Sequence, residues 1–199
     1  LLNGLSQGRT EAGRNFSSLP AIREELKSIQ RLMDGKTLID REYTADNLRN
    51  EFRNHAYSVL HIATHGVFGG EPENTFLLTY NSRLSMDYLG RLIDIGRFRE
   101  RPVELLTLSA CQTAQGDERA ALGLAGVALR AGVKSAVATL WFIDDKAASL
   151  TIREFYRQLT TPRISKAKAL QNAQKTLISK ADYRHPSYWA PFLLIGNWL

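Results

Sequence analysis

The chain has 199 residues, of which 44% are hydrophobic, and a formal net charge of +6 from 26 basic and 20 acidic side chains. This length fits one domain with a substantial core. A single cysteine excludes an internal disulfide, and neither a signal peptide nor an apolar run of about 18 residues is present, so we expect a cytoplasmic protein that does not contact a membrane.

The basic residues are scattered along the chain. The densest cluster, Arg97, Arg99 and Arg101, holds one aromatic residue and an interrupting Glu100, which favours a solvated loop over a nucleic-acid surface. We therefore expect no direct binding of nucleic acid. The sequence begins with Leu1 rather than Met, which suggests a piece of a longer protein.

Residues 1–18 are rich in Gly, Ser, Asn and Arg, which indicates a linker or the remnant of a preceding domain, with the main domain over 19–199. Beyond them, apolar spacing and capping residues predict helices over 20–33, 44–54, 86–93, 120–131, 144–159 and 165–180. Short apolar runs predict strands over 37–43, 58–64, 76–80, 103–110, 135–141 and 191–195. This alternation is typical of an α/β sandwich with a mostly parallel central sheet flanked by helices.

Two of these strands end in reactive side chains. The strand over 58–64 leads into His65 and Gly66, and the strand over 103–110 leads into Cys111. Open α/β sheets bind ligands beyond the carboxyl ends of their strands. A histidine and a cysteine at that edge are suited to act as base and nucleophile.

These histidine and cysteine residues could also have a purely structural role. A lone cysteine is more often a small buried hydrophobe, but Cys111 is followed by a polar stretch rather than by apolar neighbours. His61 lies inside a strand run and is interpreted as a core histidine. A zinc pair with His65 is disfavoured, because four residues along a strand span about 13 Å. We predict no metal and no cofactor.

Four ordered blocks of sequence resemble the CHAT domain: 61–66, 108–113, 132–145 and 185–198. CHAT domains are caspase-like cysteine peptidase domains related to separase, often found in bacteria behind tetratricopeptide repeats. The resemblance implies a caspase-like three-layer sandwich. The general caspase signature has glycine two residues after the cysteine, whereas Thr113 stands here, so a true caspase is not assigned.

The resemblance implies a cysteine endopeptidase. In this interpretation the Cys111 sulfur attacks the scissile carbonyl and His65 transfers protons, while the backbone amides of Gly66 and Cys111 form the oxyanion hole. Asp145 matches the acidic position that follows the Leu-Trp motif, and it is the candidate for binding a basic P1 residue.

Two further carboxylates are weaker candidates for binding substrate. Asp144 is equally well explained as a helix cap, and Asp117 lies just past the cysteine. The expected partners are a protein substrate and an N-terminal repeat or sensor region of the same polypeptide, without which the domain is expected to be latent. A catalytically silent interaction module and a hydrolase or acyltransferase acting on small esters or amides remain the alternatives.

Overall fold

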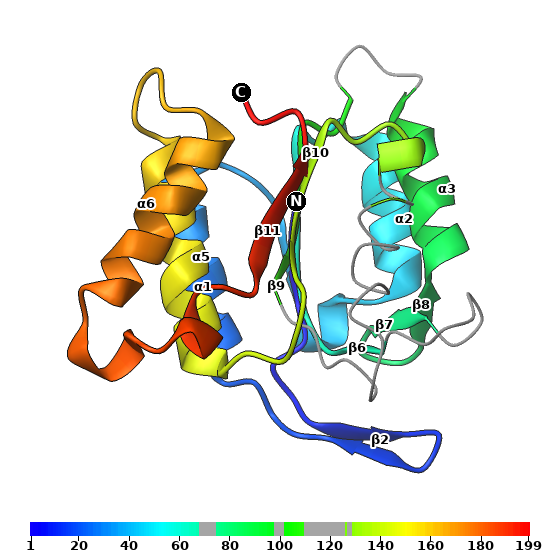
Figure 1. The fold of residues 1–199 in the computed structure, drawn as a ribbon. Coiled ribbons are helices and arrows are strands. Elements are labelled where there is room, and N and C mark those ends of the chain that lie inside the picture. Colours follow the sequence, from blue (N-terminus) through cyan, green and yellow to red (C-terminus); the bar gives the residue numbers. More distant parts are fainter. Residues whose placement is uncertain (68–74, 98–101, 110–125, 127–128) are drawn as a thin grey trace.

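The computed structural model describes residues 1–67, 75–97, 102–109, 126 and 129–199. A central sheet stands between two layers of helices, with a short hairpin projecting at one edge (Figure 1). Helices α1, α5 and α6 cover one face, and α2 and α3 cover the other (Figure 1). This is the expected α/β sandwich, with helices on both faces of a mostly parallel sheet, and the prediction of this class is confirmed.

The central sheet has six strands in the order β11-β10-β9-β5-β1-β4, and all neighbours are parallel except β10 and β11. Its strands are β1 (Leu2–Gly4), β4 (Thr37–Ile39), β5 (Val59–Ala63), β9 (Leu105–Ser109), β10 (Ser135–Thr139) and β11 (Phe192–Gly196). Two smaller antiparallel sheets consist of β2 (Arg9–Glu11) with β3 (Arg14–Phe16), and of β6 (Gly66–Val67), β7 (Phe76–Leu78) and β8 (Arg83–Ser85).

The helices begin where the capping residues predict. Side-chain oxygens of Thr44, Asp144 and Ser165 each accept a hydrogen bond from a backbone N–H in the first turn, which satisfies a donor that the helix leaves free. The helices are α1 (Ala21–Leu32), α2 (Ala45–Asn54), α3 (Met86–Arg97), α5 (Asp145–Leu159) and α6 (Lys166–Ile178).

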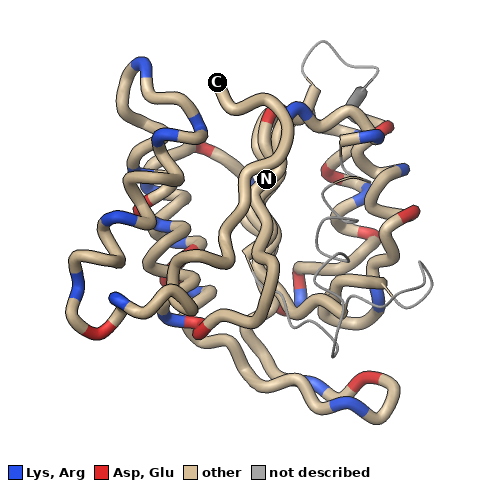
Figure 2. The backbone as a smooth tube through the Cα atoms, viewed as in Figure 1, with Lys and Arg blue, Asp and Glu red and all other residues tan. Residues whose placement is uncertain are grey.

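The alternation of side chains along β5 separates two apolar cores. Leu60 and Ile62 pack with residues of α2 and α3, whereas Ala63 packs with residues of α1, α5 and α6. Lys, Arg, Asp and Glu lie on the helices, the hairpin and the loops, and the six central strands contain none of these residues (Figure 2). Strands that are buried on both faces consist mainly of apolar residues, because a charged side chain there would lose its contact with water.

The start of the chain differs from the linker expected for residues 1–18. Leu2–Gly4 pairs with β4 on one side and β5 on the other, so it is an interior strand of the domain. Gly4 allows α1 to lie close, because a Cβ there would be 2.7 Å from both Ile22 Cγ2 and Leu26 Cδ1. Three residues are too few to produce a strand signal, and the following Gly and Ser residues predict a turn.

Other differences are local. Strands β6 and β8 were not predicted, because two or three residues carry no detectable period. The helix predicted over 120–131 lies largely outside the described residues. Of the residues in this range that the structure describes, Gly126, Leu129 and Arg130 are helical. None of the described helices is long and apolar enough to cross a membrane.

Candidate active site

Strands β5 and β9 are parallel neighbours, and both run toward the candidate residues. Ala63 pairs with Ser109, and each stands two residues before its candidate, His65 or Cys111. Cys111 itself lies outside the described residues, as does Asp117. The sheet therefore directs both chain segments to one edge, and the contact between sulfur and imidazole stays a prediction.

The imidazole of His65 is held by the end of the hairpin. Its Nε2 lies 2.7 Å from the carbonyl oxygen of Ser17, and its ring stands 5.2 Å from the Phe16 ring, centre to centre. Because a carbonyl oxygen only accepts, Nε2 carries the proton, and in the neutral ring Nδ1 keeps the lone pair. The Ser17 carbonyl thus fixes the tautomer of His65.

His65 is 4% exposed, and this burial lowers the pKa of its imidazole below the ordinary value of 6.5. The hydrogen bond to the Ser17 carbonyl acts in the opposite direction and favours the charged ring, but it is the smaller effect. The imidazole is therefore mostly neutral at neutral pH. A neutral imidazole can accept a proton, but it stabilises a neighbouring thiolate less than an imidazolium does.

Gly66 begins β6, and its amide faces away from β7. The Leu78 N–H donates to the His65 carbonyl at 2.8 Å, so these two residues form a hydrogen-bonded pair of the antiparallel ladder. Such pairs alternate with non-hydrogen-bonded ones, and Gly66 opposite Leu77 is the next pair. The Gly66 N–H is consequently not used by the ladder.

The two adjacent aspartates have different partners. Asp144 Oδ1 accepts a hydrogen bond from Ala147 N–H at 2.9 Å, as expected for the cap of α5. Asp145 Oδ2 accepts from Ala21 N–H at 2.9 Å, which joins the start of α5 to the start of α1. Within the described part of the chain, Asp145 Oδ1 makes no hydrogen bond.

The environment of Asp145 disfavours its charge. Burial raises the pKa of this carboxyl, the Ala21 hydrogen bond lowers it, and the nearby carboxylates of Glu25 and Asp144 raise it again. The result is a pKa above the ordinary value. A cation beside this carboxyl would stabilise its charged form.

His61 is fully buried, as expected for a core histidine, and takes part in a polar network beneath the site. Its Nε2 lies 2.9 Å from Glu25 Oε1 on α1, without hydrogen-bond alignment, and neither atom has another partner among the described residues. Its Nδ1 lies 3.3 Å from the Tyr156 hydroxyl, which donates to Thr107 Oγ1 at 2.9 Å. His61 and His65 thus have separate partners.

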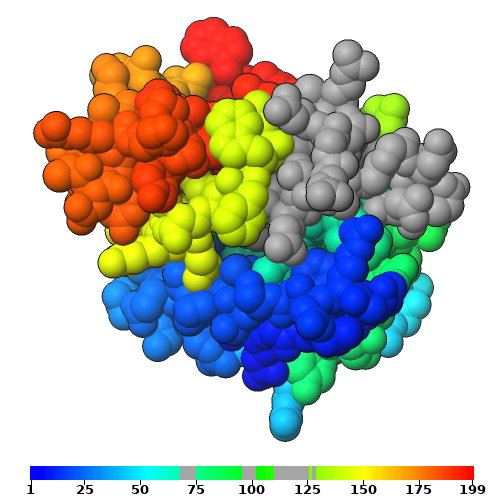
Figure 3. All heavy atoms as spheres, turned by 60° about the horizontal axis from the view of Figure 1, so that its bottom comes forward, coloured from blue at the N-terminus to red at the C-terminus, as the bar shows by residue number. Residues whose placement is uncertain are grey.

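The hairpin contributes two residues to the site that the sequence does not reveal. Figure 3 views the molecule with this edge forward, and the N-terminal residues spread over it beside the start of α5 (yellow). Ser17 acts through its backbone carbonyl and Phe16 through a ring contact. Neither role can be recognised in the sequence. Every residue type carries a backbone carbonyl, and Ser17 lies 48 residues from His65 in the chain.

Known proteins resemble this chain in sequence and in fold. Tetratricopeptide repeat protein 28 from Homo sapiens is 33% identical over 98 residues, which are 48% of this chain and 4% of that protein. The Mus musculus protein of the same name is 33% identical over 97 residues, again 48% and 4%. The chain therefore spans a small part of these relatives, and their sources give no support for a bacterial origin.

Among solved structures, the complex of Porphyromonas gingivalis RgpB pro- and mature domains has a similar fold. The TM-score is 0.62 at 12% identity, over 99% of this chain and 47% of that one. At this identity the likeness shows the fold alone. The family model of the CHAT domain matches residues 4–197, so the chain belongs to the CHAT domain family.

Proposed function

We propose that this domain is a cysteine endopeptidase in which Cys111 is the nucleophile and His65 the acid–base group. The observation that carries the proposal is the in-register pairing of β5 with β9, which brings both chain segments to one edge of the sheet. Membership of the CHAT family and the caspase-like fold support it. A protein substrate follows from this activity.

In the proposed mechanism the Cys111 sulfur attacks the scissile carbonyl carbon and forms a thioester. As the sulfur attacks, the neutral His65 takes the thiol proton on Nδ1, the nitrogen that the Ser17 carbonyl leaves free, and it then donates this proton to the leaving amine. The Gly66 N–H is suited to stabilise the oxyanion because β7 does not use it, and the Cys111 amide is the second proposed donor. Water hydrolyses the thioester and restores the thiol.

Asp145 is proposed to bind a basic P1 residue. Its carboxylate is partly buried, stands near two other carboxylates and has a raised pKa, so a cation would relieve both the burial and the repulsion. A guanidinium makes two charge-assisted hydrogen bonds where an ammonium acts as a point charge, which favours Arg over Lys. Asp144 and Asp117 are the next candidates.

The proposed regulation involves a region N-terminal to this domain. The mammalian relatives are named for tetratricopeptide repeats, and this chain spans only a small part of them. The burial of His65 and its lowered pKa support this proposal, because a neutral imidazole stabilises a neighbouring thiolate less than an imidazolium does. We therefore expect the full-length protein to reach an active state that the domain by itself does not.

The test is cleavage of fluorogenic peptides that differ only at P1, by the full-length protein. We expect cleavage after Arg above Lys and none after Asp, with complete loss in Cys111→Ala. Asp145→Asn should reduce cleavage after Arg about tenfold or more, Asp144→Asn tests the next candidate, and Asp34→Asn, at an exposed carboxylate after α1, is the matched control. Equal cleavage by wild type and Cys111→Ala would refute the peptidase, and an unchanged Asp145→Asn would refute only its P1 role.

A catalytically silent interaction module is the second candidate. The observation that favours it is the covering of His65 by Phe16 and Ser17, which leaves the ring only 4% exposed. In that case the rate at which iodoacetamide alkylates Cys111 would not change in His65→Gln. A paired thiol would be alkylated more slowly in that variant.

A further inference from the structure

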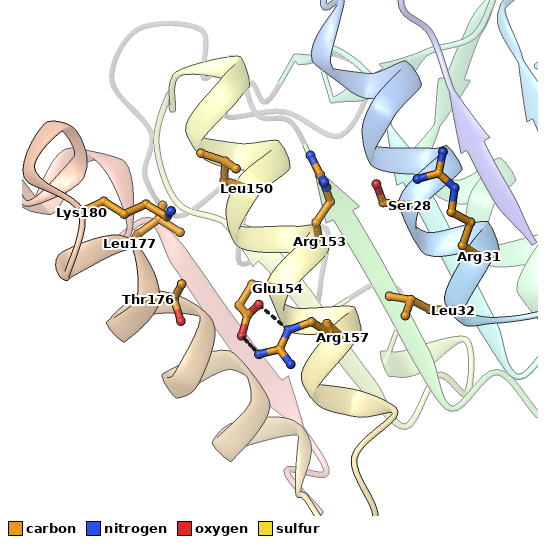
Figure 4. Close-up of a pocket in the computed structure, with 10 residues that line it drawn as sticks. All are labelled: Ser28, Arg31, Leu32, Leu150, Arg153, Glu154, Arg157, Thr176, Leu177 and Lys180. Atoms are coloured by element: carbon orange, nitrogen blue, oxygen red, sulfur yellow. Dashed lines mark hydrogen bonds and ion pairs between the residues drawn. The ribbon is translucent and has the colours of Figure 1, made fainter.

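The outer side of the layer formed by α1, α5 and α6 contains a hollow of about 350 Å³. Side chains from all three helices line it, and Lys180 closes it just beyond the end of α6 (Figure 4). It lies away from the candidate active site. Arg31 is ten residues along α1 from Ala21, which corresponds to about 15 Å of helix.

The hollow carries an excess of positive charge. Arg31, Arg153, Arg157 and Lys180 line it, against the single carboxylate of Glu154. Arg157 donates to that carboxylate from Nε at 2.7 Å and from Nη2 at 2.6 Å, and this lowers the pKa of Glu154 (Figure 4). The Glu154 charge is thus already balanced.

Three cations are left over. Arg31, Arg153 and Lys180 form no ion pair with any residue in the described part of the chain, and all three are exposed. Lys180 is attracted to Glu154 from a longer distance, but Arg157 already occupies both oxygens of that group. The hollow therefore favours an anionic ligand.

The lining also contains apolar surface and an unsatisfied hydroxyl. Leu32 is 37% exposed, and it shares the hollow with Leu150 and Leu177. The Ser28 Oγ is buried and has no hydrogen-bond partner among the described residues. A phosphate ion would pair with the cations but would leave the accessible surface of Leu32 and Leu150 in contact with water, whereas an acidic peptide with an apolar side chain can pair with the cations and cover these leucines.

We propose that this hollow binds an acidic peptide segment of a partner protein, with an apolar side chain of the segment against the leucines. The apolar contact supplies most of the affinity, and the surplus cations select acidic sequences and speed their association. The proposal is independent of the peptidase function, because none of these residues belongs to the candidate active site.

The experiment measures fluorescence anisotropy of a labelled short peptide in which glutamate alternates with leucine, titrated with the protein. Two further peptides replace either the glutamates by glutamine or the leucines by serine. The variant is Arg153→Glu. Its matched control is Lys168→Glu, which makes the same charge change on α6, where Lys168 lies outside the hollow and bonds Gln171 instead of a carboxylate.

We expect Arg153→Glu to weaken binding of the Glu-Leu peptide about tenfold and Lys168→Glu to leave it within about twofold. Both peptide replacements should also weaken binding, and added salt should reduce it. Equal effects of the two variants, or no binding at all, would overturn the proposal. So would equal binding of the serine peptide or of inorganic polyphosphate, since the hollow would then recognise anions without an apolar contact. Thermal unfolding of each variant checks that it is folded.

Discussion

His65 combines two properties that are set by different neighbours. The Ser17 carbonyl decides which nitrogen carries the proton, while burial beneath Phe16 lowers the pKa of the ring. Phe16 and Ser17 lie together at the end of β3, so this segment fixes the tautomer and contributes to the burial. Any movement of that segment would therefore change the tautomer preference and the pKa together.

The lowered pKa of His65 has a consequence for stability at acidic pH. The unfolded chain takes up a proton on this histidine near pH 6.5, while the folded protein resists it. The contribution of the neutral His65 to the free energy of unfolding is therefore fully present above about pH 6.5, and it is lost as the pH falls below that value. As the pH falls from about 8 to about 5, we expect the unfolding free energy of wild type to decrease relative to that of His65→Gln.

Urea unfolding at several pH values measures that difference. His185→Gln, at an exposed histidine, provides the control. A constant difference between wild type and His65→Gln across the range would mean that the ring titrates as in the unfolded chain.

At the scale of elements, a buried polar network connects the two central strands to the helices. Glu25 on α1 contacts His61 on β5, and Tyr156 on α5 bridges His61 to Thr107 on β9. His61 pairs with Thr107 in the sheet. The network therefore fixes α1 and α5 against the strands that lead to the two candidate residues.

Removing one partner of this network should be strongly destabilising. Glu25→Leu leaves the buried His61 Nε2 without any partner, which should cost about 3 kcal/mol of unfolding free energy. The double variant Glu25→Leu/His61→Leu removes both polar groups and should recover much of that loss. Chemical denaturation measures both variants, and a double variant no more stable than the single one would contradict this account.

The position of the hairpin follows from contacts at its base and along one side. The Ser6 N–H donates to Asp40, which also binds Arg23, and Arg9 donates to the carbonyl oxygens of Thr79 and Tyr80. The hairpin is thereby fixed between α1 and the β7–β8 turn. This brings Ser17 over His65.

At the scale of the whole molecule, β1 is the element on which the sheet depends. It lies between β4 and β5, so its loss would separate the edge strand from the rest and expose the backbone of β5. Side chains of β1 and of the residues on either side of it are also part of the core. Leu1, Leu2 and Leu5 are each at most 4% exposed.

We therefore expect deletion of residues 1–18 to abolish cooperative thermal unfolding, measured by circular dichroism. Replacing the exposed hairpin tip, Ala12 and Gly13, by two serines is the control and should leave the protein folded, since β1 remains. A truncated protein that still unfolds cooperatively would restore the interpretation of residues 1–18 as a linker.

Elements with strong local signals can be predicted from the amino-acid sequence. Apolar runs identified β5, β9 and β10, and Thr44, Asp144 and Ser165 marked the helix starts that the structure shows. The sequence also identified the family, because four ordered motifs are carried by residue types and spacing alone. Such features are local and need no partner to be recognised.

The contacts between distant segments of the chain become visible in the three-dimensional fold. This fold places the weakly patterned Leu2–Gly4 inside the sheet, sets the Ser17 carbonyl on His65, and joins Asp145 to the start of α1. Each of these contacts joins a backbone group to a position far away in the chain. Backbone groups are the same in every residue, so no pattern in the sequence reports where they bond.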